Sequence, residues 1–211
     1  MSHVDLNFPV RGSLIPRDHG YALYGALSRT VPKLHGADWI AIHGISGKLL
    51  ETGMLSLEPR GMLQVRVPVE KIVELLALTG ATLDVSGHRV ELGAPTVRAL
   101  APVSVLDARL VVIRLTEGIA KPFDRAEFER RFVAEAQRQL VERGIRGDLE
   151  LCGRRSLRVG GQRVLGHSMR VLGLSADDSL KLQIRGLGGK RTMGCGIFRP
   201  ARIKAPAKQV A

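Results

Sequence analysis

The feature that most constrains the fold of this chain is an order of strands and helices that occurs twice along it. In the first half, apolar patterns bounded by turn residues predict strands over residues 3–10, 39–43, 63–67 and 82–92, the last as a hairpin. One predicted helix begins near Asp18 and must end by Pro32, and a second begins at Pro68 and ends at Gly80. The order strand, helix, strand, strand, helix, strand is that of a ferredoxin-like βαββαβ unit.

The second half of the sequence repeats this order. Strands are predicted over residues 105–115, over 149–171 as a hairpin, and over 197–203. The longest helix begins with a capping box formed by Asp124 and Glu127 and ends at Gly144, and a shorter helix begins at Ser175. We therefore predict an α+β protein of two tandem ferredoxin-like (RRM-like) units, with the boundaries 1–95, a linker at 93–102, 103–204 with a glycine-rich loop at 186–196, and a basic tail at 205–211.

The composition of the chain limits the classes of partner that it can bind. The chain has 211 residues, 45% hydrophobic and 25% charged, which is ordinary for a globular protein. Its 32 Lys and Arg against 20 Asp and Glu give a formal charge of +12, which favours a nucleic acid or an anionic membrane surface. There is no apolar run of the ~20 residues that span a membrane and no signal-peptide pattern, and the cysteines have no zinc-ligand spacing. We expect a cytoplasmic protein with no metal and no cofactor, and we expect its partner to be a nucleic acid and no membrane, although an anionic membrane surface stays the alternative.

The most unusual segment is Gly186–Phe198, in which five glycines fall within eleven residues around Lys190 and Arg191. Glycine tolerates positive φ and lets other atoms approach the backbone, so the pattern predicts exposed N–H groups beside two cations, which suits a phosphate. Arg191 stands where a Walker-type loop has Ser or Thr and where the dinucleotide fingerprint has a glycine, so neither motif fits. The residues predicted to contact a polynucleotide backbone are Gly188, Gly189, Lys190, Arg191, Gly194 and Gly196; the alternative is a simple turn.

The run Gly-Leu-Gly-Gly-Lys-Arg-x-x-Gly-Cys-Gly-Ile-Phe resembles the C-terminal glycine-rich loop of the CRISPR-associated RNA-binding proteins called RAMPs. Among these it is similar to the repeat-processing endoribonucleases of the MYXAN-type group. The resemblance implies the same tandem arrangement of ferredoxin-like units over nearly the whole chain. It also implies CRISPR repeat RNA (pre-crRNA) as the partner, and leaves open whether other subunits of an effector complex bind as well.

A second basic segment lies between Arg154 and Arg170, where the sequence has five arginines and no acidic residue. If this segment is a hairpin, it forms a cationic ribbon beside the glycine-rich loop. We predict that Arg155, Arg158 and Arg170 contact a groove of the nucleic acid, because Arg can pair with guanine edges. His167, inside the ribbon, is predicted to contact RNA without doing chemistry. The alternative is a solvated charged face.

Histidines are the candidates for cleavage chemistry. RNA supplies its own nucleophile, the 2′-hydroxyl, so the protein must supply a base, an acid for the 5′-oxygen and a cation. Histidine suits the proton steps because its unperturbed pKa lies near neutrality. His19 precedes the first predicted helix and His35 follows it. His43 lies on a predicted apolar strand, so we expect it to be packed rather than reactive.

The family resemblance ranks these candidates for the catalytic histidine. It implies a histidine after the first helix that works with a helix tyrosine and a nearby lysine. In this sequence His35 is that histidine, Tyr21 or Tyr24 the tyrosine and Lys48 the lysine. His35 is therefore the first catalytic candidate and His19 the second.

Three functions compete at this point. The first, implied by the resemblance, is a metal-independent endoribonuclease that binds and cleaves the repeat stem-loop of CRISPR precursor RNA to make mature guide RNA, leaving 5′-hydroxyl and 2′,3′-cyclic phosphate ends. The second is a non-catalytic CRISPR RNA-binding subunit of an effector complex. The third is an adaptor for anionic membranes or acidic proteins. Cleavage in a chelator separates the first two, and preference for a hairpin RNA over anionic vesicles separates both from the third.

Overall fold

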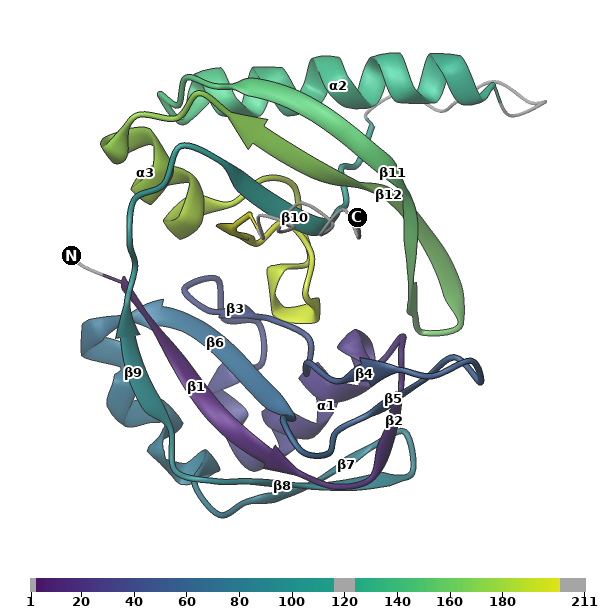
Figure 1. Cartoon of the computed structure of the whole chain (residues 1–211), viewed down its shortest axis with the longest axis vertical. Helices are drawn as coiled ribbons and strands as arrows, with labels where there is room; N and C mark the ends of the chain where they lie inside the picture. The colour runs from purple at the N-terminus through teal and green to yellow at the C-terminus, as the bar shows by residue number, and fades with distance from the viewer. Residues whose placement is uncertain (1–2, 116–123, 202–211) are drawn as a thin grey trace, which may run out of the picture.

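Two lobes joined by one extended segment make up the computed structural model, which describes residues 3–115 and 124–201 (Figure 1). The first lobe contains the chain up to strand β9, and the second begins at strand β10. The glycine-rich loop of the second lobe extends into the space between the lobes, towards β3 and α1 (Figure 1). The termini of the described chain therefore belong to different lobes.

The first lobe is built on a sheet with the strand order β3-β6-β1-β8-β7, in which β9 pairs with the part of β1 that β8 leaves open. Its main elements are β1 (His3–Arg11), α1 (Gly20–Thr30), η1 (Pro32–Leu34), β3 (Ala41–Ile42), β6 (Met62–Pro68), η2 (Val69–Leu78), β7 (Thr82–Val85), β8 (His88–Leu92) and β9 (Thr96–Ala99). Helix α1 buries Leu23, Ala26 and Leu27, which lie on one face because they are three and four residues apart.

The second lobe has a sheet with the strand order β11-β12-β10-β13. Its elements are β10 (Leu106–Val111), α2 (Arg125–Glu142), β11 (Asp148–Val159), β12 (Gln162–Leu172), α3 (Ala176–Arg185), η3 (Arg191–Met193) and β13 (Phe198–Pro200). The Asp124 carboxylate accepts from the N–H groups of Ala126 and Glu127 at 2.8 and 3.2 Å, which confirms the predicted start of α2. Ser175 caps α3 in the same way, accepting from the N–H of Asp178 at 3.1 Å.

Both sheets place their strands in one order. Counted in chain order, the four strands of the unit are β1, β3, β6 and β8 in the first lobe and β10, β11, β12 and β13 in the second. In each lobe the first of these strands is central, the third and fourth lie on either side of it, and the second lies beyond the third. This is what the repeated βαββαβ pattern predicts. The prediction of two tandem ferredoxin-like units is confirmed.

Several local predictions were wrong. The expected linker contains β9, which pairs with β1. Residues 69–78 form a 3₁₀ helix, because their apolar residues Val69, Ile72, Leu75 and Leu78 recur every three residues, the period of that helix. Asp18 does not cap α1; its carboxylate accepts from the N–H of Arg158 at 2.9 Å.

A small third sheet was not predicted at all. It consists of β2 (Leu14–Pro16), β4 (Lys48–Leu49) and β5 (Met54–Ser56), in the order β2-β5-β4. Two- and three-residue strands are too short to carry an alternating pattern. The predicted tail, 205–211, and the end of the predicted closing strand lie outside the described residues.

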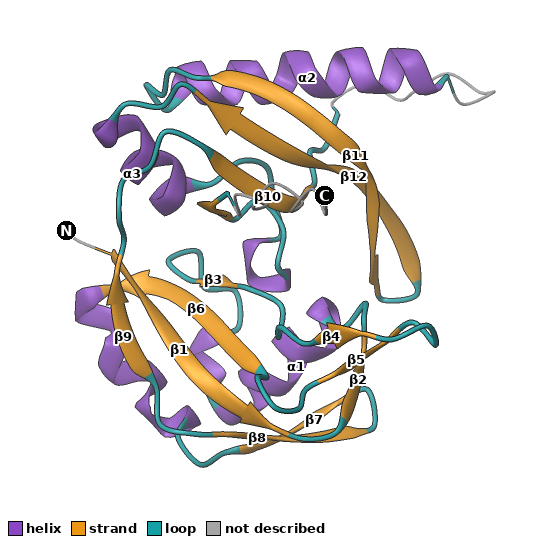
Figure 2. Cartoon of the chain, viewed as in Figure 1, coloured by secondary structure: helices purple, strands orange, loops and turns teal. Residues whose placement is uncertain are grey.

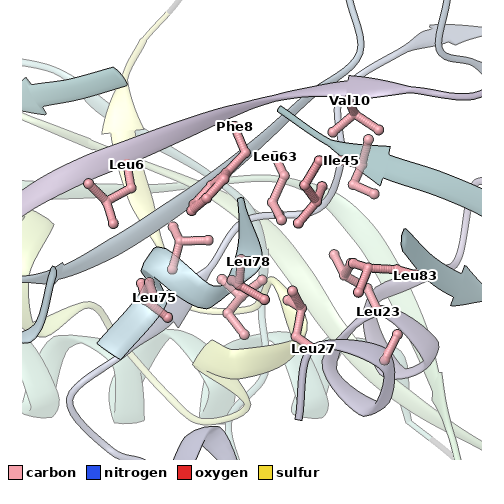
Figure 3. Packing of buried hydrophobic residues seen from close by; sticks show 14 of the residues in the cluster. Leu6, Phe8, Val10, Leu23, Leu27, Ile45, Leu63, Leu75, Leu78 and Leu83 are labelled. Atoms are coloured by element: carbon pink, nitrogen blue, oxygen red, sulfur yellow. The ribbon is translucent and has the colours of Figure 1, made fainter. Parts of the chain in front are cut away.

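Each lobe has its own core. In the first lobe, Leu6 and Phe8 of β1 belong to one buried cluster with Leu23 and Leu27 of α1 and Leu78 of η2 (Figure 3). In the second, the core joins α2 to the sheet, and its fully buried members include Phe132, Leu140, Met169, Val171 and Phe198. The exact boundaries of the two units stay a prediction.

The side chain of Arg66, in β6, makes hydrogen bonds to both lobes. It is 1% exposed, and its guanidinium holds both carboxylate oxygens of Asp5 at 2.8 and 3.0 Å. The same guanidinium donates to the backbone carbonyls of Gln183 and Phe198 in the second lobe, both at 2.8 Å. The position of the glycine-rich loop relative to the first lobe therefore depends on a buried ion pair that belongs to the first lobe.

Candidate functional site

The glycine-rich loop (residues 186–196) packs on itself and against the first lobe. Its short helix η3 lies against α1 and β3 (Figure 2). Gly186, Gly188 and Gly196 have φ of 62°, 68° and 65°. A Cβ on any of the three would lie 2.0–2.2 Å from a backbone carbonyl oxygen, so no larger residue fits without moving the backbone. These glycines permit a tight turn.

The N–H groups of the loop glycines are used within the protein. The donors and acceptors are Gly188 to the side-chain oxygen of Gln139 at 2.8 Å, Gly189 to the carbonyl of Val112 at 2.9 Å, Gly194 to that of Arg191 at 3.4 Å and Gly196 to that of Leu110 at 2.7 Å. The expectation that these glycines present free N–H groups to a phosphate was therefore wrong. Their contact with RNA stays a prediction, based now on where the loop lies rather than on free donors.

The two cations of the loop, Lys190 and Arg191, differ in how available they are to RNA. The Arg191 guanidinium turns into the protein and donates to the carbonyl of Ile184 at 2.6 Å. Burial, with smaller effects from Arg66 and Arg143, lowers the pKa of Arg191 to about 10. Lys190, in the left-handed conformation with φ of 61°, is half-buried. Arg191 would have to leave its carbonyl to reach RNA, so Lys190 is the better placed of the two predicted contacts.

A cavity lies between the glycine-rich loop and the first lobe. Gly194 lines it, together with four arginines: Arg17 before α1, Arg109 of β10, Arg155 of β11 and Arg199 of β13. We call it the arginine cavity. No Asp or Glu of the described chain is among its lining residues. Positive charge from both lobes is thus collected in one place.

His19 lines the arginine cavity but is held by the backbone. The residue is 4% exposed. Nδ1–H donates to the carbonyl of Pro16 at 2.8 Å, and Nε2 accepts from the N–H of Ile45 at 2.8 Å. Burial lowers the pKa of His19. Both nitrogens therefore have structural partners, which makes His19 a poor proton-transfer group despite its place in the cavity.

His43 lines the same cavity and is the contrasting case. Its Nε2 is buried, with no hydrogen-bond partner among the described residues. Burial first, and then the charges of Arg66, Arg199 and Arg191, hold the pKa of His43 well below its usual value. The sequence suggested only a packed histidine here, because the apolar strand gave no sign of the arginines that surround it.

The predicted ribbon exists. Strands β11 and β12 pair from Asp148 to Val159, and Arg158 lies directly opposite Arg163. Arg155 and Arg158 are three residues apart and so point to opposite faces of β11, so one face of the ribbon cannot present both to a groove of the nucleic acid. A second groove adjoins the arginine cavity and shares three arginines with it. Its lining residues are Arg17, Asp18, Arg109, Arg154, Arg155, Ser156, Arg163 and Leu165, and we call it the ribbon groove.

Two predicted RNA contacts are occupied within the protein. The Arg170 guanidinium holds both carboxylate oxygens of Asp107, at 2.7 and 3.0 Å. His167 is 1% exposed, with its ring 5.7 Å from that of Phe128 and 5.0 Å from that of Phe132. The expectation of a surface His167 was wrong, because its face of β12 is turned towards α2.

His35 lies in a different place, at the end of η1. It is exposed, and its ring is 6.4 Å from the ring of Tyr24, with 15° between the planes. The Tyr24 hydroxyl donates to the carbonyl of Leu34 at 3.4 Å and accepts from the N–H of Gly36 at 2.9 Å. Tyr24 thus fixes the turn that carries His35.

A cavity beside His35 brings several polar side chains together. Its lining residues are Tyr21, Ala22, Tyr24, Gly25, Ser28, Arg29, Pro32, His35, Asp84 and Ser86, and we call it the tyrosine cavity. Tyr21 is 46% exposed. Lys48, the predicted cation, is an exposed residue of β4 and lines neither cavity, whereas Arg29 does line this one. Arg29 could have been found from the sequence, because it lies two steps of four residues after Tyr21 on the same helix face.

The described residues form neither a metal site nor a membrane-spanning helix. Across residues 3–115 and 124–201, no three His, Cys, Asp or Glu side chains lie close enough together to hold a metal ion. No helix in the described part of the chain is long and apolar enough to span a membrane.

Comparison with known proteins supplies the family. A family model described as Cas6 Crispr matches residues 4–203. The chain belongs to the Cas6 family. A protein of Myxococcus xanthus (strain DK1622) named CRISPR-associated endonuclease Cas6 is 40% identical over 212 residues, which cover 99% of this chain and 87% of that protein. The resemblance to the repeat-processing RAMP proteins is confirmed.

Solved structures of Cas6-type proteins share the fold. One comes from the characterization of a Cas6-related gene from Pyrococcus furiosus, with a TM-score of 0.65, 14% identity and coverage of 94% of this chain and 97% of that one. Another, described as an RAMP protein binding different RNA substrates, has a TM-score of 0.64, 13% identity and coverage of 94% and 99%. At these identities the likeness concerns the Cas6 fold and not the site residues.

Proposed function

We propose that this member of the Cas6 family is a metal-independent endoribonuclease that binds the repeat stem-loop of CRISPR precursor RNA and cleaves it to make mature guide RNA. The 40% identity to a protein named as a CRISPR-associated endonuclease, over 99% of this chain, supports the reaction class. The charge of +12 supports a polyanionic substrate. The repeat RNA is the substrate class that family membership favours.

One observation carries the proposal: an exposed histidine stands at the rim of a cavity that also contains two tyrosines and an arginine. His35 is the proton-transfer residue, and Tyr24 positions it. Tyr21 is exposed at the same cavity and is the tyrosine available to the RNA. Arg29 takes the place proposed for Lys48 and stabilises negative charge on the phosphorane.

The reaction needs only the groups of RNA and protein. A base removes the proton of the 2′-hydroxyl, the 2′-oxygen attacks the adjacent phosphorus, and the bond from phosphorus to the 5′-oxygen breaks. An acid returns a proton to that oxygen, so the products carry a 2′,3′-cyclic phosphate and a 5′-hydroxyl. His35 serves one of the two proton steps, and a positioned acid or base contributes ~10²–10⁴-fold to the rate.

The test is cleavage of a repeat hairpin by the full chain in EDTA. We expect one cut, at the same rate with EDTA as with added Mg²⁺, and products whose ends are a 2′,3′-cyclic phosphate and a 5′-hydroxyl. Replacing the 2′-hydroxyl at the cut position by hydrogen should abolish the cut but not binding. A scrambled hairpin of the same length is the matched control.

Three outcomes would overturn the proposal. Cleavage that stops in EDTA contradicts metal independence, and a 5′-phosphate product contradicts the attack by the 2′-oxygen. Tight hairpin binding with no cut in either buffer would leave a non-catalytic CRISPR RNA-binding subunit as the function.

A further inference from the structure

The arginine cavity is built from segments far apart in the sequence. Arg17 comes from the first lobe, whereas Arg109, Arg155 and Arg199 come from three strands of the second. The gap in which they meet is closed by η3 of the glycine-rich loop, which contacts α1 and β3. The cavity exists only because the two lobes are held in this arrangement.

Most of the positive charge of this cavity is not balanced by a carboxylate of the described chain. Within residues 3–115 and 124–201, Arg17, Arg109 and Arg155 form no ion pair, whereas Arg66 and Arg170 each hold a carboxylate. Like charges gathered in a partly enclosed space repel one another more strongly than they do in bulk water. An anion in the cavity would relieve that repulsion, so the arrangement favours an occupied state.

His43 adds a buried polar atom that lacks a partner. Its Nε2 makes no hydrogen bond to a described residue, whereas both ring nitrogens of the neighbouring His19 are bonded. A buried polar atom without a partner lowers stability. A phosphate oxygen beside His43 would accept a hydrogen bond from the protonated ring.

The cavity continues into the ribbon groove. Arg17, Arg109 and Arg155 line both hollows. A chain of phosphates can therefore lie along the ribbon with one phosphate in the cavity, whereas a single small anion would leave the groove empty. This continuity favours a phosphodiester of RNA over free phosphate.

We propose that the arginine cavity binds one phosphodiester of the RNA that runs between the lobes, with Arg17, Arg109 and His43 as its donors. The proposal deepens the proposed function and rests on RNA being the substrate. It assigns these three residues to holding the strand, and it leaves the cleavage chemistry to His35 in the tyrosine cavity.

Binding at this site is expected to depend on pH. The charged groups around His43 are Arg17, Arg66, Arg109, Arg155, Arg191 and Arg199, and the other titratable side chain at the cavity is His19. Burial, and after it the charges of Arg66, Arg199 and Arg191, lower the pKa of His43 in the free protein, and a bound phosphate raises that pKa. Affinity is then highest below the pKa of the free protein and falls as the pH rises through the pKa of the complex.

The experiment measures the affinity of the full chain for repeat RNA, with 2′-deoxyribose at the cut position if a cut occurs. We expect Arg17→Ala and Arg109→Ala each to weaken binding about 10- to 100-fold, the usual loss for a hydrogen bond to a charged group. Each should also reduce the log–log salt slope by about 1. Arg98→Ala, which removes an exposed arginine of β9, is the matched control and should change neither.

Two further measurements use His43. Wild-type affinity should rise by up to about tenfold per unit as the pH falls from 8 to 6, and His43→Gln should lose that dependence. NMR titration of the His43 ring should show its pKa raised by RNA. If inorganic phosphate raises this pKa and RNA does not, the site binds free phosphate and the proposal is overturned.

Failure of this proposal is distinct from failure of the proposed function. Unchanged affinity and salt slope in Arg17→Ala and Arg109→Ala, with normal cleavage by the wild type, overturn the phosphate site alone. Loss of affinity in both variants, with no cleavage by the wild type, overturns the endoribonuclease alone.

Discussion

The tyrosine cavity and the arginine cavity both contain a histidine, but they are built in different ways. The first is formed by one lobe, from α1, the turn after η1 and the β7–β8 turn, and Arg29 is its one arginine within the described chain. The second is formed by both lobes and contains four arginines. A site formed by one lobe keeps its geometry if the lobes shift, whereas a site between lobes does not. The difference suggests that chemistry and strand binding are divided between the two.

The two histidines differ in the same way. His35 is exposed beside Tyr24, on a turn that the tyrosine hydroxyl holds from both sides. The ring of His43 lies among cations, and its Nε2 is buried without a partner. An exposed ring can give and take protons with a substrate, and a ring surrounded by arginines is suited to an anion that stays bound.

The largest effect is expected from His35→Ala. If His35 is a proton-transfer residue, the rate constant for cleavage at saturating protein should fall ~10²–10⁴-fold, while the RNA dissociation constant changes little. Single-turnover cleavage and a binding assay on the same RNA measure the two quantities. Lys33→Ala, an exposed change two residues earlier, is the control. The division between the cavities fails if His43→Gln slows single-turnover cleavage as much as His35→Ala does.

The next largest effect is expected from Arg66→Met. This change leaves the buried Asp5 carboxylate without its cation and removes the donor to Gln183 and Phe198. Breaking a buried ion pair by removing one partner lowers the free energy of unfolding by about 3–5 kcal/mol. Urea unfolding measures the loss, and Arg98→Met is a surface control.

Arg66→Met also tests the comparison between the cavities. Because Arg66 joins the lobes, RNA affinity should fall in protein that remains folded, while the single-turnover rate constant at saturation stays near that of the wild type. A rate constant that falls as steeply as the affinity would mean that the tyrosine cavity also depends on the junction. Asp5→Asn combined with Arg66→Met should recover part of the stability, since no buried charge is left alone.

A third effect concerns pH and stability. His19 and His43 have pKa values below 6.5 in the folded protein, chiefly because of burial. The unfolded chain therefore binds more protons, so stability is full above pH 6.5 and is lost as the pH falls from 6.5 towards the folded pKa values. Each histidine contributes a slope of up to about 1.4 kcal/mol per pH unit in that window. Urea unfolding at pH 7.5 and 5.5 should show a smaller difference for His43→Gln than for the wild type, and equal differences would contradict a neutral buried His43.

Much of the fold could be predicted from local patterns. The capping residues Asp124 and Ser175 predict the starts of α2 and α3, because their side chains accept hydrogen bonds from N–H groups within the next three residues. The repeated order of elements then determines the order of both sheets. Strand β9 was not predicted, because it consists of four exposed residues without an alternating apolar pattern. Its pairing with β1 is a contact between residues far apart in the sequence, which a local pattern cannot indicate.

The sites were less predictable because they depend on where side chains point. The sequence placed His35 and Tyr21 in one region, and they line one cavity. It could not reveal that Arg170 is held by Asp107, or that the guanidinium of Arg191 turns inwards. It also missed Arg109, whose exposed position on a strand of buried neighbours becomes significant only when the other lobe lies beside it. Charge patterns gave the class of partner, and tertiary contacts decide which charges are available to it.

The smallest effect is expected from Gly194→Ala, in the wall of the arginine cavity. Gly194 has φ of 82°, and an added Cβ would meet the Arg109 guanidinium at 3.5 Å, an ordinary contact. The cost is therefore backbone strain, about 1–2 kcal/mol in the free energy of unfolding. Gly189→Ala is the matched control in the same loop, with no positive φ and no atom within 4 Å of its Cβ, and should change stability little. Urea unfolding of both variants measures the difference. Because the new methyl group restricts Arg109, RNA affinity should also fall a few-fold in Gly194→Ala relative to the wild type; an unchanged affinity would mean that this wall of the cavity does not face RNA.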